Sequence, residues 1–313
     1  MNERETLYQI ARMYYIEDAT QVQIAERFGL SRPNVSRSLK RCRELGIVRI
    51  ELTYPYSTNH QLQETLKRRF HLRDAVVVSN TNSPEGGQVL VGRAAAFYLK
   101  TLIRNGEVVG LSWGSTLCEV VQAYDSDPLD DVAVVQLMGG LELLPGAHQA
   151  NVLVQRMADA VGGRPYFLYA PVLVQKEHAR ELLVQDRSIR EILALGRRAT
   201  VAVVGIGALD PRHPSALMSI LPAEAIAELK QAGAIGEVCC QFYDADGKPC
   251  NTSLADRTVG ISIADLDRIP TLIAVAHGLE KANAIRAALR GGWADVLVTD
   301  EATARSVLVD GNP

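Results

Sequence analysis

The chain has 313 residues, of which 47% are apolar and 22% charged, and its formal net charge is −3. This composition is typical of a globular protein, and the longest apolar stretches, such as Val201–Leu209, are too short to span a bilayer. The first residues are charged, which argues against a signal peptide. We therefore expect a cytoplasmic protein whose small first domain leaves roughly 250 residues for a second.

The number and spacing of the cysteines also favour a cytoplasmic protein. The five cysteines are an odd number with no Cys-x-x-Cys pair; Cys239 and Cys240 are adjacent and the others are isolated. Such spacing favours reduced, packed thiols over disulfides or a metal site. We expect no metal and no cofactor.

The N-terminal region contains a pattern typical of two helices joined by a tight turn. Thr20 and Gln23 have the spacing of a capping box, which satisfies amides at a helix start. Gly29 can adopt the left-handed conformation that ends this helix, and Ser31 can cap the next one. Pro33 is tolerated in the first turn because its missing amide would have no intrahelical partner.

Apolar residues recur at helical spacing in three segments of this region. They predict a first helix packed behind the pair (Leu7, Ile10, Ala11, Tyr14), the inner side of the second (Val22, Ile24, Ala25, Phe28) and that of the third (Val35, Leu39, Cys42).

The outward face of the third helix is cationic or hydroxylated. Between Arg27 and Arg49 there are seven Lys or Arg and one acid, Glu44, in a chain of negative net charge. This local charge is typical of a nucleic-acid-binding surface, and arginine and asparagine can contact base edges in the major groove. We predict a helix-turn-helix whose DNA-contacting residues are Gln21, Ser31, Arg32, Asn34, Ser36, Arg37, Lys40 and Arg41.

The segment from Gly46 to Leu52 alternates apolar and polar residues after a glycine, which predicts a short strand and a winged form of the motif. The DNA-binding domain would then cover residues 1–55. The alternative is a helical hairpin with a solvated cationic side. We disfavour it because turn, caps and charge agree.

Residues 59–70 predict a helix with Leu62, Leu66 and Phe70 on one face. Two roles fit this helix equally well. It could separate two DNA-reading heads by a fixed distance, or it could be a surface helix of the larger domain.

From Asp74 onward, β-branched runs alternate with helical stretches, which predicts an α/β domain with a mostly parallel, doubly wound sheet. The expected strands are Ala75–Ser79, Val108–Leu111, Val132–Gln136, Tyr166–Tyr169, Thr200–Gly205, Thr271–Ala276 and Asp295–Thr299. The expected helices are Pro84–Ile103, Thr116–Tyr124, His148–Val161, Lys176–Leu195, Leu279–Leu289 and Glu301–Leu308.

Ligands of such folds bind at the carboxyl ends of the strands, where this sequence places small residues. After Val108–Leu111 come Ser112, Gly114, Ser115 and Thr116, then a helix whose free amides favour an anion such as a phosphate. An unliganded helix-capping turn is the alternative. Four such loops at one edge favour a cleft; the others contain Gln136 with Gly139 and Gly140, Ala170–Pro171 and Gly205–Gly207.

Two polar clusters follow. Asp244, before Asp246-Gly247, either belongs to a plain hairpin or accepts hydrogen bonds from a sugar. Lys281 lies in the first turn of a predicted helix, after His277 and Gly278. The helix dipole disfavours a cation there, so this lysine is either solvated or serves a nearby anion, and we favour the second role.

Together these motifs resemble the SorC family of bacterial transcription regulators, a sugar-responsive group, over essentially the whole chain. The resemblance rests on Gln23–Glu26, Ser36–Leu39, Ser112–Thr116, Val203–Ala208, Phe242–Gly247, Gly278–Lys281, Ala288–Gly292 and Leu297–Asp300.

The resemblance implies an effector domain, residues 56–313, related to sugar-phosphate isomerases and glucosamine-phosphate deaminases but retained as a sensor. It implies that Gly114, Ser115, Thr116 and Lys281 contact an effector phosphate. Asp244 would lie near the effector's hydroxyls, and Gln136 with Gly139 and Gly140 would line the same cleft. It also implies dimers or tetramers. His277 stands where many relatives have glycine, which alters the pocket.

We therefore predict a regulator whose binding to double-stranded operator DNA is controlled by a sugar, a sugar alcohol or a sugar phosphate. The alternative is an isomerase- or deaminase-type enzyme with a DNA-binding head, for which Asp244, Glu280 and His277 are the acid–base candidates. A pure interaction scaffold would leave the cationic helix and the glycine loops unexplained. We expect no membrane partner.

Overall fold

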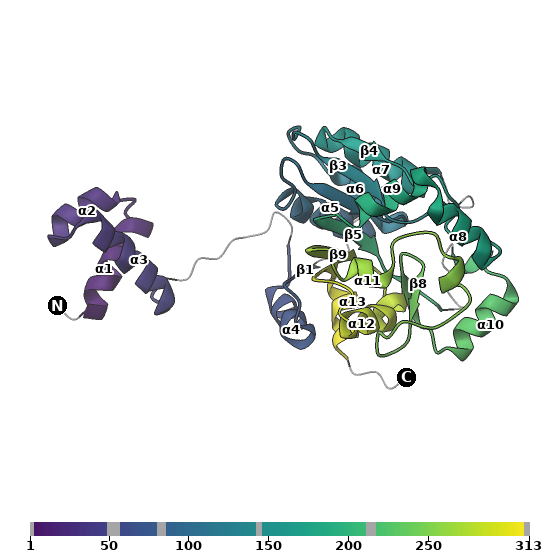
Figure 1. Cartoon of the computed structure of the whole chain (residues 1–313). Coiled ribbons are helices and arrows are strands. Elements are labelled where there is room, and N and C mark those ends of the chain that lie inside the picture. The colour runs from purple at the N-terminus through teal and green to yellow at the C-terminus, as the bar shows by residue number, and fades with distance from the viewer. Residues whose placement is uncertain (1–2, 49–56, 80–85, 142–145, 211–216, 310–313) are drawn as a thin grey trace. The chain divides into compact units, whose positions relative to one another are not determined.

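The computed structural model describes residues 3–48, 57–79, 86–141, 146–210 and 217–309. The chain divides into two compact units, Met1–Pro55 and Tyr56–Pro313. Figure 1 shows the helices and strands of each unit. In the described segments, no helix is both long and apolar enough to cross a lipid bilayer.

The first unit consists of α1 (Glu3–Tyr15), α2 (Gln21–Phe28) and α3 (Arg32–Glu44). Its core is formed by Ile10, Ile24, Val35 and Leu39, each at most 4% exposed. The predicted capping box at Thr20, the left-handed Gly29 and the Ser31 cap are all present. The three predicted helices are therefore confirmed.

Two details of the first unit differ from expectation. Val22 is 52% exposed, because the short helix α2 buries only Ile24 and Ala25. The described part of the expected strand, Gly46–Val48, forms a turn in which Ile47 and Val48 pack on α1 and Cys42. Residues 49–52 lie outside the described residues.

The second unit is built on a seven-stranded sheet with the order β1-β10-β9-β5-β2-β3-β4, in which every pairing is parallel. The strands are β1 (Asp74–Val78), β2 (Val108–Leu111), β3 (Ala133–Gln136), β4 (Arg164–Tyr166), β5 (Val201–Gly205), β9 (Thr271–Val275) and β10 (Val296–Asp300). The predicted parallel α/β fold is confirmed.

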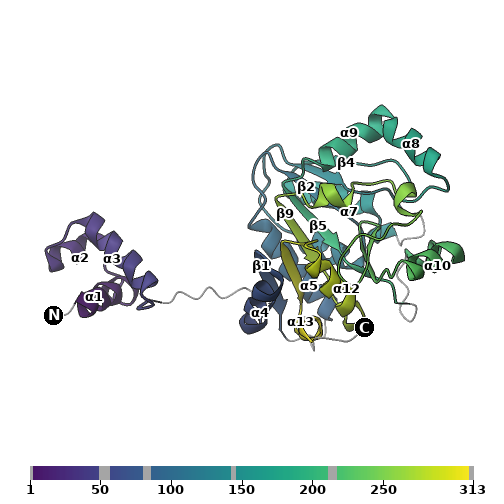
Figure 2. The same ribbon diagram turned by 60° about the horizontal axis from the view of Figure 1, so that its bottom comes forward.

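Helices cover both faces of this sheet, as the second view also shows (Figure 2). One face packs against α5 (Gly87–Lys100), α6 (Ser115–Ala123) and α7 (Ala150–Val161). The other packs against α4 (His60–Phe70), α9 (Arg187–Gly196), α12 (Ala282–Arg290) and α13 (Glu301–Leu308). Because side chains alternate along a strand, Ala75 and Val77 enter the second of these cores and Val76 and Val78 do not.

Helix α4 packs on β1 and α13, with Leu62 and Leu66 buried. Of the two roles weighed for this segment, the structure therefore supports a surface helix of the larger unit. The expected helix over residues 176–195 is divided into α8 (Glu177–Gln185) and α9, because Asp186 caps α9 by accepting the Ser188 amide at 2.8 Å.

The expected strand Tyr166–Tyr169 was placed too late in the chain, since β4 begins at Arg164 and ends at Tyr166. Its Pro165 is tolerated because β4 lies at the sheet edge. The sequence analysis also missed a small antiparallel sheet and two helices: β6 (Gly207–Ala208), β7 (Gly236–Val238), β8 (Gln241–Tyr243), α10 (Ala223–Gln231) and α11 (Ile263–Leu266).

Candidate DNA interface and effector site

The turn between α2 and α3 is fixed by local hydrogen bonds. Thr20 Oγ1 accepts the Gln23 amide at 3.3 Å, and Gln23 Oε1 accepts the Thr20 amide at 2.9 Å. Gly29 ends α2 at φ 62°, and Ser31 Oγ accepts the Asn34 amide at 3.4 Å. These contacts hold α3 at a fixed angle behind the turn, as a recognition helix requires.

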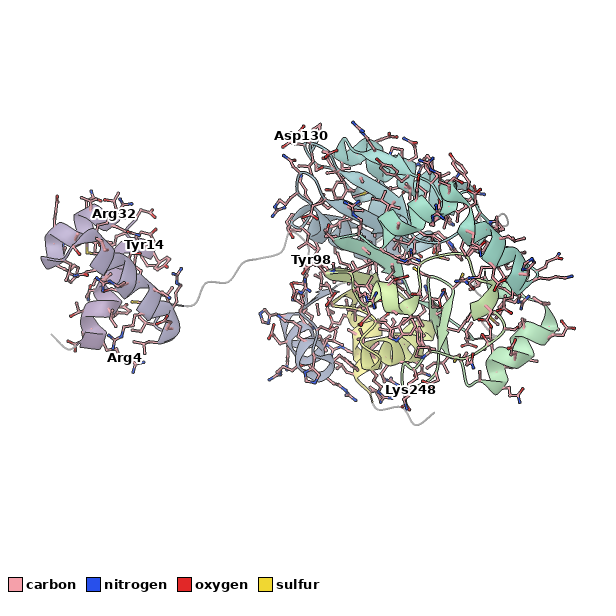
Figure 3. All side chains as sticks on the ribbon, in the orientation of Figure 1. Arg4, Tyr14, Arg32, Tyr98, Asp130 and Lys248 are labelled. Atoms are coloured by element: carbon pink, nitrogen blue, oxygen red, sulfur yellow. The ribbon has the colours of Figure 1, made fainter. Side chains whose placement is uncertain are left out.

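Helix α3 has a buried side, formed by Val35, Leu39 and Cys42, and an exposed polar side. Arg32 is labelled on this unit in Figure 3. The predicted DNA-contacting residues that are exposed are Ser31, Arg32, Ser36, Arg37, Lys40 and Arg41; Gln21 and Asn34 are half-buried.

Arg37, Asn34 and Lys40 are among these side chains and contact neighbours. Arg37 Nη2 donates to Asn34 Oδ1 at 2.6 Å, and Lys40 Nζ lies 3.8 Å from a Glu44 carboxylate oxygen. The first contact aligns a guanidinium and an amide, the two groups that make bidentate contacts to guanine and adenine. The second is an exposed ion pair of little stabilising value.

In the second unit, Ser112 joins two neighbouring strand ends. It is 3% exposed, its Oγ accepts the Gly205 amide at 3.3 Å, and its own amide donates to the Val203 carbonyl at 3.2 Å. Gly114 then starts α6 at φ 136°, without a side-chain cap and with open space where a Cβ would lie. The first turn of α6, with Ser115 and Thr116, is thus built as an uncapped helix start.

The same loop contains an unpartnered donor. Trp113 Nε1 is buried and has no hydrogen-bond partner among the described residues. An unpaired buried N–H costs about 1–3 kcal/mol, so this group is one that a bound molecule or water would satisfy. The sequence analysis did not single out Trp113.

The side chain of Gln136 is hydrogen-bonded to backbone groups of two loops. The buried Gln136 side chain donates from Nε2 to the Met138 carbonyl at 2.7 Å and accepts the Leu168 amide at Oε1. Gly139 lies against Pro171, where an added Cβ would come within 2.5 Å of backbone atoms. Both amide atoms of Gln136 therefore support the loop, whereas Gly140 borders a cavity of about 840 Å³.

Lys281 is the N-cap of α12, and its ammonium group is partly removed from water. Burial lowers its pKa, while the carboxylates of Glu280 and Glu237 act in the opposite direction. No hydrogen bond or ion pair joins its ammonium to any residue within the described ranges. A desolvated cation without a close counter-ion is suited to an anionic ligand group.

Glu237 is the carboxylate that the sequence analysis missed. It is set in β7, its Oε2 accepts the Cys240 amide at 2.9 Å, and burial raises its pKa. Its Oε1 lies close to Gly207, because a Cβ added to Gly207 would come within 2.2 Å of this oxygen. An acid inside the apolar run Gly236–Cys240 was the signal available in the sequence.

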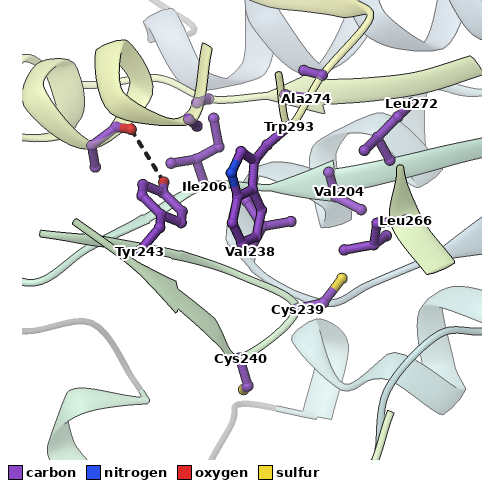
Figure 4. Close-up of a cluster of buried hydrophobic side chains, with 14 of the residues drawn as sticks. Val204, Ile206, Val238, Cys239, Cys240, Tyr243, Leu266, Leu272, Ala274 and Trp293 are labelled. Atoms are coloured by element: carbon purple, nitrogen blue, oxygen red, sulfur yellow. Dashed lines mark hydrogen bonds between the residues drawn. The ribbon is translucent and has the colours of Figure 1, made fainter. Parts of the chain in front are cut away.

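The turn after Glu237 is made of Cys239 and Cys240. Both have left-handed backbones, with φ of 52° and 58°, and both are 3% exposed. Figure 4 shows their side chains pointing to opposite sides of the hairpin. All five cysteines are buried and free, and burial raises their pKa values, as expected for packed thiols.

His277 lies between two elements at the same edge of the sheet. Its Nε2 is 3.8 Å from Asp300 Oδ2, and a Cβ on Gly87 would come within 2.4 Å of the same nitrogen. Asp300 caps α13 by accepting the Thr303 amide at 2.9 Å and its hydroxyl, and Thr303 Oγ1 accepts the Gly278 amide at 3.1 Å. This network fixes the loop that leads to Lys281.

Asp244 lies elsewhere. Its Oδ1 accepts hydrogen bonds from the amides of Asp246 and Lys248 at 2.9 Å each, so it closes a turn after β8. Lys248 is labelled in Figure 3. Gly247 in this turn packs against the last turn of α12, and Lys281 lies before the first. The nine residues of α12 separate these ends by roughly 13 Å. The structure does not bring Asp244 together with Lys281.

The predicted effector residues thus fall into three places at one edge of the sheet, with Asp244 apart from them. Lys281 and His277 lie in the loop after β9, with Glu237 beside Lys281, and Ser112, Gly114, Ser115 and Thr116 follow β2. Gln136 ends β3, and Gly139 and Gly140 follow it. Asp244 is remote from these groups. All but Asp244 lie at the carboxyl ends of the parallel strands, the usual ligand edge of this fold.

Comparisons with known proteins agree with this organisation. Residues 54–309 match the family described as "Putative sugar-binding domain", and residues 4–53 match the MarR family. The deoxyribonucleoside regulator of Bacillus subtilis is 33% identical, covering 96% of each chain. The sorbitol operon regulator of Klebsiella pneumoniae is 31% identical, covering 96% of this chain and 97% of that one.

A solved structure extends the likeness to the whole fold. The full-length sorbitol operon regulator SorC from Klebsiella pneumoniae superposes with a TM-score of 0.77 at 30% identity, covering 99% of this chain and 100% of that one. The chain therefore belongs to the SorC family of transcriptional regulators, in which a helix-turn-helix unit precedes a sugar-binding domain.

Proposed function

We propose that the protein binds operator DNA through α3 and that a sugar, sugar alcohol or sugar phosphate, bound at the carboxyl edge of the sheet, controls this binding. The observation that carries the proposal is the exposed cationic side of α3, whose other side is buried. Arg32, Asn34, Ser36 and Arg37 would read bases or contact phosphates, and Gln21, Ser31, Lys40 and Arg41 would position the helix on the backbone.

We propose that Lys281 and the start of α6 hold an anionic group of the effector. Glu237 would accept hydrogen bonds from hydroxyl groups beside it, a role that the sequence analysis gave to Asp244. The desolvated ammonium and the open space at Gly114 support this placement. An anion there would give Lys281 a hydrogen-bonded counter-ion, whereas the carboxylates of Glu280 and Glu237 act on it without a direct contact among the described residues.

Control of DNA binding would follow from linkage. A dimer or tetramer presents paired heads to half-sites about one helical turn, roughly 10 bp, apart. An effector that fits one arrangement of subunits better than another shifts DNA affinity by that difference in binding free energy and no more.

We propose that the site senses its ligand without converting it. At the carboxyl edge of the sheet, His277 and Asp300 form a histidine–carboxylate pair, but Asp300 already caps α13 through both oxygens. Purified protein incubated with a panel of sugar phosphates should leave every compound unchanged. Turnover of any of them would favour the enzyme alternative.

Nuclease footprinting on the DNA upstream of the protein's own operon tests the regulatory proposal. We expect protection of an inverted repeat, strengthened or weakened by at least one sugar-class compound. Equal binding to every duplex, unaffected by any compound, would contradict it.

Replacement of Arg37 by alanine should weaken binding to the operator by about 1–3 kcal/mol and relax the preference at one base pair, because a bidentate contact is lost. Gel-shift titrations on the operator and on single-base variants measure this. Arg12→Ala, which removes an exposed cation of α1, is the matched control and should leave base preference unchanged. An equal loss on operator and unrelated DNA would assign Arg37 to a phosphate.

A further inference from the structure

The cavity beside Gly140 has no charged side chain among the described residues that line it. It measures about 840 Å³ and lies where β3 and β4 end. Its walls are formed by Gln136, Gly140, Leu141, Gln149, Asn151, Leu168, Tyr169, Ala170, Pro171, Val172, Leu173 and Ile220. A desolvated phosphate or carboxylate needs a cation or a set of donors, so this lining favours an uncharged occupant.

Among the described lining residues, the polar side chains are three carboxamides and one phenol. Gln136 is committed to its loop, as described above, and the Gly140 backbone pairs with Ala170 and Val172 at 2.8 and 2.9 Å. Gln149 and Asn151 lie at the start of α7. A carboxamide offers donors and acceptors together, which matches hydroxyl groups and the edges of uncharged heterocycles.

An aromatic ring stands at the cavity wall. Tyr169 is 81% exposed and its ring lies 5.8 Å from that of Phe167, tilted by 51°. An exposed aromatic ring in a concave site is a stacking surface for another ring with an apolar face. Leu141, Leu168 and Val172, each at most 6% exposed, form an apolar floor beside it.

The size of the cavity limits the occupant further. Ligand pockets of about 300–1,000 Å³ enclose drug-sized molecules, so a single monosaccharide would leave much of 840 Å³ to water. A molecule of two rings fits this volume better.

The charged part of the effector site is close but separate. Ser112 and Gly114 follow β2, the immediate neighbour of β3, at a strand spacing of about 4.8 Å. Lys281 follows β9, three strands from β3 in the sheet order, so roughly 14 Å away along the same edge. The cavity therefore supplies a recognition surface that the anion-binding residues do not.

We propose that this cavity binds an uncharged two-ring glycoside, that is, a ring-form sugar joined to a second uncharged ring, with one ring stacked on Tyr169. The proposal goes beyond the proposed function, because this uncharged ligand is distinct from the anionic group that Lys281 and the start of α6 would hold, and it rests on the proposed function only in taking this sheet edge as the effector-binding side. Disaccharides and nucleosides are the two sources of this chemistry.

Gly140 allows a direct test. A Cβ at this position meets open space, and its backbone conformation is one that other residues adopt. Gly140→Leu should therefore fill the cavity without unfolding the protein. Gly146→Leu is the matched control, since Gly146 also has open space and ordinary backbone but does not line the cavity.

The assay is thermal unfolding and calorimetric titration of the full-length protein with four groups of compounds. These are disaccharides (sucrose, trehalose, maltose), nucleosides (adenosine, thymidine, cytidine), their component monosaccharides with linear polyols, and the corresponding phosphates. We expect an uncharged two-ring compound to bind the wild-type protein and Gly146→Leu equally, to bind Tyr169→Ala about tenfold more weakly, and to bind Gly140→Leu at least a hundredfold more weakly. The arm that contains this compound identifies the source.

Three outcomes would overturn the inference. If only monosaccharides, polyols or phosphates bind, and Gly140→Leu binds them like the wild type, the inference fails while the proposed function stands. If no compound binds or alters operator binding, the effector part of the proposed function fails, and the inference with it. If Gly140→Leu changes the sedimentation behaviour and no two-ring compound binds, the cavity is an interface between copies of the chain.

Discussion

Replacement of Lys281 by methionine is expected to abolish most of the effector response and, at the same time, to stabilise the unliganded protein. A charge-assisted hydrogen bond to an anionic effector contributes about 1.5–3 kcal/mol, so its loss should weaken effector binding roughly tenfold to a hundredfold. The free energy of unfolding should rise because methionine keeps an apolar side chain at this half-buried position and removes a partly desolvated charge whose pKa is lowered.

The pH dependence of this stabilisation has a defined sign. Because the folded-state pKa of Lys281 lies below its ordinary value of 10.5, the unfolded chain binds more protons between these two values. The wild-type protein therefore gains stability as pH rises through this window. The advantage of the methionine variant should be largest at neutral pH and should shrink toward pH 10.5.

Urea unfolding followed by tryptophan fluorescence measures the stability effect, since both tryptophans, Trp113 and Trp293, lie in the second unit. Gel shifts with the active compound measure the response. Lys230→Met, an exposed lysine of α10, is the control and should change neither. A destabilised Lys281→Met protein that still responds fully would contradict the proposed role of this lysine.

Gly247→Ala is expected to destabilise the second unit by about 2–4 kcal/mol, of which about 1–2 kcal/mol comes from the left-handed backbone and the rest from overpacking. Gly247 has φ 78°, and a Cβ would come within 2.3–2.6 Å of backbone atoms of Ala287 and Gly291. These atoms belong to the end of α12 and cannot move independently. The turn is also held by Trp293 Nε1, which donates to the Gly247 carbonyl at 2.7 Å.

Gly233→Ala provides the comparison for this variant. Gly233 has φ 70° but open space around its Cβ position, so its replacement should cost only the backbone strain, roughly 1–2 kcal/mol. Urea unfolding of the three proteins, followed by tryptophan fluorescence, measures both values. Equal losses in the two variants would mean that the close approach to α12 contributes nothing.

The turn at Gly247 matters for function because it supports the helix that begins after Lys281. Tyr243 donates from its hydroxyl to the Ala284 carbonyl at 3.1 Å, and its ring centroid lies 4.8 Å from that of Trp293. Figure 4 shows both side chains. The small sheet β6-β7-β8 thereby carries Glu237 at one end and fixes α12 at the other. Asp244 contributes to this support by closing the turn.

Much of the first unit was predictable from the sequence, because its signals are local. Thr20 with Gln23, Gly29 and Ser31 each act through neighbours three or four residues away, and they formed as predicted. The parallel sheet was also predictable, since strands buried on both faces are continuous β-branched runs. Local signals and periodicity together determined the fold class and the cationic side of α3.

Only the tertiary structure decided which polar residues share a site. Glu237 lies in β7 and Asp244 follows β8, and the register pairs Glu237 with Phe242. The packing of this hairpin on α12 then places Glu237 near Lys281 and the turn closed by Asp244 against the other end of the helix. Likewise Gln136 is committed to Leu168, and Gly140 opens into a cavity completed by residues up to Ile220. Pairing register and packing between distant segments set these relations, and neither is encoded in the spacing of residues along one stretch of chain.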